Sequence, residues 1–352
     1  MKKSSLTIRA GRQALSALRN GFSADLFSTL LGASGGPKWL VLAAIDRVLA
    51  RRLVAARTTP LHAFGTSIGA FRHTALAQSD PVAAIDRFLA AYVAQAYETK
   101  PTAAEVSEQS RIILDVLLGD NGTEVLEHPF LRLHVGTVRG RGPVATDQRA
   151  GLLLGLGAAA TANALSRRLL GYFFERVVFH STSDSVFTFH DLATRQTHLN
   201  SSNLRDATLA SGSIPMVMAA LRDIAGAPSG LYRDGGITDY HFDLDFDAPA
   251  GLILYPHFFD RITPGWFDKA LPWRRASGAL RDRTLFISPS PEFVASLPRG
   301  KVPDRADFTT HSTAERQRRW QQVGVACERL GDELEELMEG TRLAEAARPF
   351  PA

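Results

Sequence analysis

Two short turns near the N-terminus place a serine between glycines, an arrangement that can make a hydroxyl nucleophilic. Gly32–Gly36 reads Gly-Ala-Ser-Gly-Gly and Gly65–Gly69 reads Gly-Thr-Ser-Ile-Gly, so Ser34 and Ser67 hold the central positions. In a Gly-x-Ser-x-Gly turn, small flanking residues let a strand bend sharply into a helix and leave the serine exposed at the tip. A serine also needs a base and donors for the oxyanion that forms when it attacks a carbonyl. The turns therefore indicate acyl transfer, but spacing alone does not choose between the two serines.

Three further segments have residue types that suit this chemistry. Gly35 and Gly36 precede Pro37, which has no N–H, so the two glycines supply the free backbone donors and allow close approach of a ligand. Far downstream, Asp234 lies in the turn sequence Arg-Asp-Gly-Gly, where an isolated aspartate usually bonds its own backbone. Before it, residues 210–215 read Ala-Ser-Gly-Ser-Ile-Pro.

Together these segments resemble the patatin-like phospholipase family over residues 24–250. Members have a glycine-rich loop after the first strand, a Gly-x-Ser-x-Gly turn one strand and helix later, and an Asp-Gly-Gly or Asp-Gly-Ala turn after an alanine/serine-rich segment that ends in proline. Here the loop is Ser34–Lys38, the serine turn is Gly65–Ala70 and the aspartate turn is Asp234–Gly236. Each motif is weak alone, and the order of all four carries the resemblance.

The resemblance implies a three-layer α/β/α fold with a mainly parallel central sheet, and a serine–aspartate dyad that uses no histidine and no cofactor. Ser67 would attack an ester carbonyl, and Asp234 would accept the serine proton and later activate water. The expected activity is hydrolysis of carboxylic esters of lipids, as in phospholipases A, lysophospholipases and lipid esterases. The expected oxyanion donors are the N–H groups of Gly35, Gly36 and Ile68, and the supporting residues are Gly65, Gly69, Lys38, Gly235 and Gly236.

The glycine-rich loop departs from the family pattern. The family has a third glycine, an arginine and a closing glycine where this chain has Ser34, Lys38 and Trp39. Lysine supplies positive charge but lacks the planar two-donor fork of arginine. We interpret Ser34 as a loop residue, and Trp39 as closing the loop or lining the acyl site. The altered loop also leaves open a non-catalytic protein that binds lipid or a partner on the same scaffold.

A Ser-His-Asp esterase is a second alternative. Chain order allows Ser67, Asp234 and then His257 or His311, although no neighbouring residue marks either histidine. Nucleotide binding is not expected, because the loop lacks the Gly-Lys-Ser/Thr ending of a P-loop. No metal is expected either, because the alternating aspartates of 243–247 are followed by neither the glycine nor the glutamate of a calcium loop.

The strands and helices on either side must position both serine turns. Strand patterns and helix patterns alternate along the first hundred residues. Buried strands are expected at Leu26–Leu31 and Leu61–Phe64, helices at Pro37–Leu53 and Ala70–Gln78, and a helix capped by Asp80 after them. This alternation predicts a mainly parallel sheet covered by helices. Further strands are expected at 131–138, 177–180, 186–190, 196–199, 251–255 and 284–287, and further helices at 11–22, 102–118, 150–174 and 203–209.

The C-terminal helix has the clearest pattern. Ser312 and Glu315 suit a capping box, and an apolar stripe then follows at three- and four-residue steps from Trp320 to Leu337. Such a stripe packs on its own domain or on a second copy, so a homodimer through this helix is one expectation. The expected organisation is a catalytic core at 24–250 and a C-terminal extension at 251–352 packed on it as one globular unit.

Composition narrows the classes of partner. The 352 residues are 45% hydrophobic with a net charge of +4 and no basic run of five, which argues against nucleic acid. The single cysteine, Cys327, fits a reducing, cytoplasmic compartment. Arg9 and Arg12 interrupt the apolar region that a signal peptide would need.

One apolar stretch suggests contact with lipid. The uncharged stretch Ala150–Ser166 is shorter than the ~20 residues that span a bilayer, so no transmembrane segment is predicted. This stretch, with the loop that carries Trp266 and Trp273, suits peripheral contact with a membrane surface.

Overall fold

A ten-stranded sheet forms the centre of the computed structural model, which describes residues 4–119, 122–274 and 278–351. Its five central strands run parallel in the order β12, β11, β2, β3 and β4, and antiparallel pairing of β1 with β12 and of β5 with β4 extends it at both sides. The strands are β1 (Leu6–Ala10), β2 (Phe27–Gly32), β3 (Leu61–Thr66), β4 (Leu131–Gly140), β5 (Phe174–His180), β7 (Thr194–His198), β8 (Leu221–Arg222), β9 (Leu231–Asp234), β11 (Leu252–Pro256) and β12 (Thr284–Pro289). A separate ribbon pairs β6 (Thr188–Phe189) with β10 (Phe246–Asp247).

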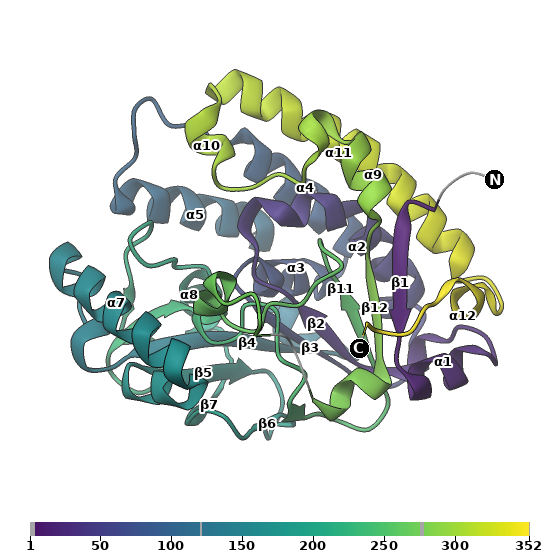
Figure 1. Ribbon diagram of the computed structural model, residues 1–352, viewed down its shortest axis with the longest axis horizontal. Coiled ribbons are helices and arrows are strands. Elements are labelled where there is room, and N and C mark those ends of the chain that lie inside the picture. The colour runs from purple at the N-terminus through teal and green to yellow at the C-terminus, as the bar shows by residue number, and fades with distance from the viewer. Residues whose placement is uncertain (1–3, 120–121, 275–277, 352) are drawn as a thin grey trace.

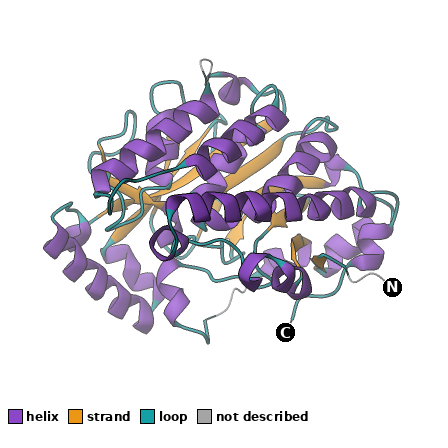
Figure 2. Cartoon of the chain, turned by 90° about the horizontal axis from the view of Figure 1, so that it is seen from above, coloured by secondary structure: helices purple, strands orange, loops and turns teal. Residues whose placement is uncertain are grey.

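Helices flank this sheet, and the mixed α/β fold with a mostly parallel sheet confirms the expected fold class. Figure 1 shows α4, α5 and α11 above the sheet and β6 below it, and Figure 2 shows helices lying across the strands. The α-helices are α1 (Arg12–Leu18), α2 (Ala43–Leu49), α3 (Ile68–Leu76), α4 (Pro81–Ala94), α5 (Ala103–Leu118), α6 (Glu124–Glu127), α7 (Arg149–Leu165), α8 (Leu204–Ser211), α9 (Pro291–Ser296), α10 (Asp307–Thr310), α11 (Thr313–Leu337) and α12 (Arg342–Ala346).

Short 3₁₀ segments link these elements, and several of them carry site residues. They are η1 (Ala24–Leu26), η2 (Gly36–Leu42), η4 (Gly142–Val144), η5 (Arg167–Tyr172), η6 (Gly235–Ile237), η7 (Trp266–Ala270), η8 (Ala279–Arg283) and η9 (Pro298–Gly300), while η3 (Ala50–Val54) is a π-helical turn. The helix expected at Pro37–Leu53 therefore begins as a 3₁₀ helix and ends in a π turn. Proline at its second residue suits this start, because its missing N–H would have no acceptor there.

The continuous helix expected at 150–174 is wrong in its C-terminal part. α7 ends at Leu165 because Ser166 has extended backbone, with φ −159° and ψ 132°. The chain then forms η5 and enters β5 at Phe174. No described helix is long and apolar enough to cross a membrane.

The residues after 250 contribute to the same sheet and its helical cover. β11 lies between β2 and β12, and α11 packs on α2. Trp320, Val323, Cys327 and Leu330 of the apolar stripe are buried within the chain, and Ser312 caps the helix through the Glu315 N–H. A homodimer through α11 stays a prediction, and the stripe that suggested it is already covered by the chain's own helices.

Candidate active site

Ser67 lies at a sharp turn between β3 and α3. Its backbone has φ 53° and ψ −129°, values that a residue with a side chain rarely adopts and that mark stored strain. The turn is possible because Gly69 packs against the backbone of Gly32, where a Cβ atom at either glycine would overlap the other chain segment. The expected nucleophile turn is therefore present, with Ser67 at its tip.

The Ser67 hydroxyl donates a hydrogen bond to Asp234 Oδ2 at 2.8 Å. Asp234 ends β9, which pairs with β4 and so reaches the C-terminal end of the neighbouring β3. Its other oxygen, Oδ1, accepts the Gly236 N–H at 2.7 Å, which fixes the carboxylate. The contact expected between positions 67 and 234 is present, and both residues are buried.

The segment 210–215 supports both members of this pair. The Ser211 hydroxyl accepts the Ser67 N–H at 2.9 Å and donates to the Gly136 carbonyl at 2.7 Å. The Ser213 carbonyl accepts the Asp234 N–H at 3.1 Å. The alanine/serine-rich motif therefore acts as a support beneath the serine turn and the aspartate turn, a role that its sequence did not specify.

Burial changes the acid–base behaviour of Asp234. Loss of solvent raises the pKa of its carboxyl from 3.8 to about 6, although the hydrogen bonds from Ser67 and Gly236 lower it. A general base works best when its pKa lies near the working pH, because it is then both ionised and basic enough to take a proton. Asp234 meets this condition near neutrality.

The glycine-rich loop lies beside the pair. Gly35, Gly36 and Ser67 line one small hollow together with Asp234. Gly36 and Ile68 are the first residues of η2 and α3, where backbone N–H groups have no acceptor within the helix. These are the backbone groups that could face an oxyanion.

Ser34 is placed as a loop residue. Its hydroxyl hydrogen-bonds to Thr66 Oγ1 at 2.9 Å, and its N–H donates to the Tyr240 carbonyl at 2.8 Å. Gly236 packs directly against its side chain, so a larger residue at 236 would collide with Ser34. Trp39 does not line the cavity described below, and it is buried in the core, where it stacks on Phe88.

No histidine completes the pair. All ten histidines are described, and none hydrogen-bonds to Ser67 or Asp234. His257 is buried and bonds the Phe259 carbonyl at 2.6 Å. His311 accepts hydrogen bonds from Arg299 and Arg319, both at 2.8 Å. The two histidines considered for a Ser-His-Asp triad therefore have other partners.

A large cavity of about 1420 Å³ opens onto Ser67. Pockets for small molecules commonly have about 300–1,000 Å³, so this cavity has room for a ligand with a long chain. Many of its walls are apolar, and they include Phe71, Phe88, Val106, Ile113, Leu152 and Met216.

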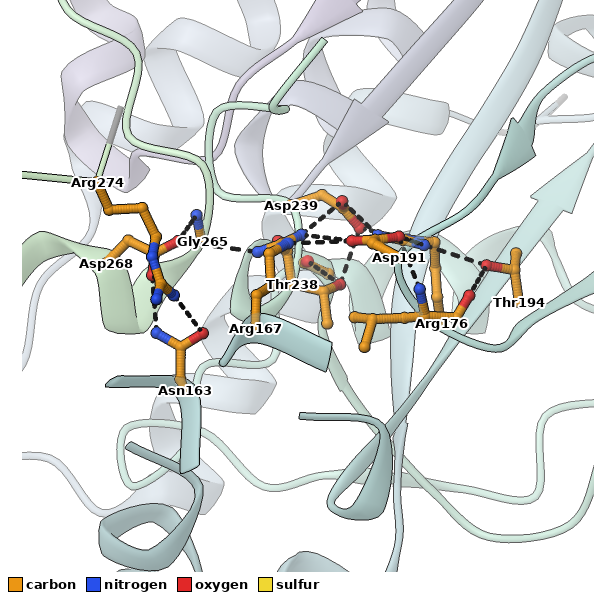
Figure 3. A network of polar contacts seen from close by, with 12 residues as sticks. Asn163, Arg167, Arg176, Asp191, Thr194, Thr238, Asp239, Gly265, Asp268 and Arg274 are labelled. Atoms are coloured by element: carbon orange, nitrogen blue, oxygen red, sulfur yellow. Dashed lines mark hydrogen bonds and ion pairs between the residues drawn. The ribbon is translucent and has the colours of Figure 1, made fainter. Parts of the chain in front are cut away.

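A buried polar network holds the backbone behind the site (Figure 3). Arg176 of β5 donates hydrogen bonds to both oxygens of the Asp239 carboxylate, at 2.7 and 2.8 Å. The backbone carbonyl of Asp239 accepts a hydrogen bond from the hydroxyl of Thr66, the residue before Ser67. Arg167 donates to the Thr238 carbonyl at 2.7 Å. The network therefore fixes the turn that follows Asp234.

The same network reaches η7. Asp268 is buried and accepts hydrogen bonds from Asn163 at 2.7 Å, the Gly265 N–H at 2.9 Å and Arg274 at 3.0 Å (Figure 3). This fixes the backbone next to Lys269, which lines the small hollow with Ser67.

Sequence reasoning missed Lys269 and Arg305. Both line the hollow together with Lys38, which had been noted for its place in the loop. They come from η7 and from the loop before α10, far from every motif in the chain. No local pattern marks them, since only the folded chain brings these segments to Ser67.

No protein-family model and no curated protein matches the chain. Among solved structures it is similar to the crystal structure of VipD from Legionella pneumophila, with 14% sequence identity and a TM-score of 0.30. The match covers 73% of this chain and 53% of that chain, so this chain spans about half the length of VipD.

Proposed function

We propose that this protein is a serine acyl hydrolase of the patatin-like type that cleaves carboxylic esters of lipids. The observation that carries the proposal is the 2.8 Å contact between Ser67 Oγ and Asp234 Oδ2 at a strained turn beside a large, partly apolar cavity. The order of the glycine-rich loop, the serine turn and the aspartate turn supports it. A dyad needs no metal or cofactor.

In the first half-reaction, Asp234 takes the Ser67 proton while Oγ attacks the ester carbonyl carbon. The carbonyl oxygen becomes an oxyanion that faces the N–H groups of Gly35, Gly36 and Ile68. The C–O bond to the alcohol then breaks, and the alcohol leaves with the proton from Asp234. The acyl group stays on Ser67.

In the second half-reaction, Asp234 takes a proton from water, and the resulting hydroxide attacks the acyl carbon. Collapse of the second oxyanion breaks the bond to Oγ, and the proton returns to Ser67. The fatty acid leaves, and the dyad is restored. One ester and one water therefore give one acid and one alcohol.

A neutral fluorophosphonate probe tests the proposal directly. We expect stoichiometric labelling at Ser67, mapped by mass spectrometry, and at least about a thousandfold loss of ester hydrolysis in Ser67→Ala. Ser34→Ala is the matched control and should keep labelling. An unlabelled wild-type protein without ester hydrolysis would instead favour the non-catalytic lipid- or partner-binding alternative.

We also propose that the protein is cytoplasmic and meets lipid at a membrane surface through α7. Leu153, Leu154 and Leu165 are 60%, 77% and 78% exposed, and no charged residue lies between the ends of this helix. Figure 1 shows α7 at the edge of the molecule. Arg149 at its start and Leu152 in its first turns also line the large cavity, so a lipid at this face would lie near the cavity.

A further inference from the structure

The small hollow beside the dyad is much smaller than the large cavity, and Tyr240 forms part of its wall. Tyr240 is buried and lines the hollow together with Ser67 and Asp234. The hollow has a volume of about 40 Å³. A water needs at least about 10–15 Å³, whereas pockets for drug-sized ligands have about 300–1,000 Å³. The hollow therefore has room for water but not for a lipid chain.

Backbone hydrogen bonds and ring contacts hold Tyr240 in place. Its N–H donates to the Pro264 carbonyl at 2.7 Å, and its carbonyl accepts the Ser34 N–H at 2.8 Å. The phenol ring stacks on His241, with 4.2 Å between the ring centroids. The Lys269 ammonium lies 3.7 Å from the centre of the phenol ring, within the range of a cation–π contact. A group fixed in this way loses little conformational entropy when it binds.

The hydroxyl of Tyr240 has no hydrogen-bond partner among the residues that the structure describes. The hydroxyls of two other buried tyrosines, Tyr232 and Tyr255, both donate to backbone carbonyls. A buried tyrosine hydroxyl usually has such a partner, so a polar molecule in the hollow would supply one to Tyr240. Burial raises the pKa of Tyr240, so its hydroxyl stays neutral and leaves Asp234 as the base.

Acylation of Ser67 changes the hydrogen bonds of Asp234. In the free enzyme, Asp234 Oδ1 accepts the Gly236 N–H and Oδ2 accepts the Ser67 hydroxyl. An acylated Oγ carries no proton, so Oδ2 loses its donor and can accept a water proton instead. Gly35 and Gly36 line the same hollow, so an acyl carbonyl that faces their N–H groups would lie next to this water.

We propose that Tyr240 positions the water that hydrolyses the acyl-enzyme, an inference that rests on the proposed hydrolase function. The water donates one hydrogen bond to Asp234 and one to Tyr240 Oη, which leaves an oxygen lone pair for the acyl carbon. Asp234 takes the proton, and the water oxygen bonds to the acyl carbon. The bond from this carbon to Ser67 Oγ then breaks, and the proton passes to Oγ. Tyr240 neither gains nor loses a proton.

Tyr240→Phe tests the proposal, because it removes the hydroxyl and keeps the ring. With a p-nitrophenyl ester of a fatty acid, the initial burst of nitrophenol reports acylation, and the later steady rate reports deacylation. We expect the burst rate to stay as in wild type and the steady rate to fall about tenfold, the size of one hydrogen bond. Mass spectrometry after acid quenching should show the acyl group accumulated on Ser67.

Tyr232→Phe is the matched control. It also removes the hydroxyl of a buried tyrosine, but Tyr232 does not line the hollow. The ratio of burst rate to steady rate should therefore stay as in wild type. An equal loss of both rates in Tyr240→Phe would overturn the proposal, because the hydroxyl would then serve the oxyanion or the fold. An unchanged steady rate, or the same change of ratio in Tyr232→Phe, would overturn it as well.

Fluorophosphonate labelling separates a failure of this inference from a failure of the proposed function. Labelling needs only the attack by Ser67, so Tyr240→Phe should be labelled as fast as wild type. If wild type is labelled and hydrolyses the ester, but the two rates of Tyr240→Phe change together or not at all, only the water position is rejected. A wild-type protein with neither labelling nor hydrolysis would reject both proposals.

Discussion

Replacing Asp234 with asparagine should make the protein more stable while removing its activity. The substitution keeps the shape of the side chain, and the amide can still accept the Gly236 N–H and face Ser67. It removes a charge that the fold buries without a direct ion pair, since Asp234 bonds only to a hydroxyl and a backbone N–H, while Lys269 and Arg305 only line the same hollow. The stability gain and the activity loss therefore have the same cause.

The size of the gain follows from the pKa. A carboxyl whose pKa rises from 3.8 to about 6 on folding binds its proton more tightly in the folded chain. The favourable contribution of this carboxyl to the free energy of unfolding is complete below its ordinary pKa and is lost as the pH rises through about 6. At about pH 8 the ionised carboxylate therefore costs about 3 kcal/mol, which asparagine avoids.

Denaturant unfolding of wild type and Asp234→Asn between about pH 5 and pH 8 measures this difference. We expect the variant to be more stable by up to about 3 kcal/mol at the upper end and by less at the lower end. Ester hydrolysis should fall at least about a thousandfold, because an amide cannot take the Ser67 proton. A variant less stable than wild type at about pH 8, or a difference independent of pH, would refute this account of the buried carboxylate.

Asp239→Asn is the matched control. Asp239 is also buried, but it pairs with Arg176 at 2.7 Å, so its loss leaves a buried guanidinium with less compensation. We expect it to destabilise the protein by about 3 kcal/mol, the lower end for a broken buried pair, because Asp191 still contacts Arg176. If the two substitutions change the free energy of unfolding with opposite signs, a buried carboxylate without a direct ion pair is distinguished from one that has such a pair.

Two further predictions concern pH and membrane contact. For a neutral ester, kcat/KM should rise through about pH 6 as Asp234 ionises and then stay level. A kcat/KM that does not change between about pH 5 and pH 8 would contradict this. The double substitution of Leu153 and Leu154 by serine should weaken sedimentation with phospholipid vesicles at least about tenfold, because two exposed leucines no longer enter the lipid, while hydrolysis of a soluble ester stays unchanged. Val325→Ser, at an exposed position of α11, is its control, and equal sedimentation of all three proteins would exclude α7 as the contact.

Local patterns predicted most of the elements that carry the site. The strands and helices around both serine turns lie within a few residues of their expected places, and Asp80 caps α4 as its sequence indicated. β1 and β9 were not predicted. β9 is four residues long and is stabilised by its pairing with β4 and β8, which no local pattern reports. The end of α7 was misplaced because the apolar run continues beyond the backbone break at Ser166.

The sequence by itself determined which segments form the turns that carry the reactive groups, because the backbone preferences of glycine, proline and serine depend only on neighbouring residues. It marked Ser67, Asp234 and the loop at Gly35 and Gly36, but two serine turns matched equally well. Only the tertiary structure separated them, since the contact between Ser67 and Asp234 spans 167 positions and depends on which strands lie side by side. The meeting of Lys38, Lys269 and Arg305 beside Ser67 was decided in the same way, because three distant segments acquire a common environment only after the chain has folded.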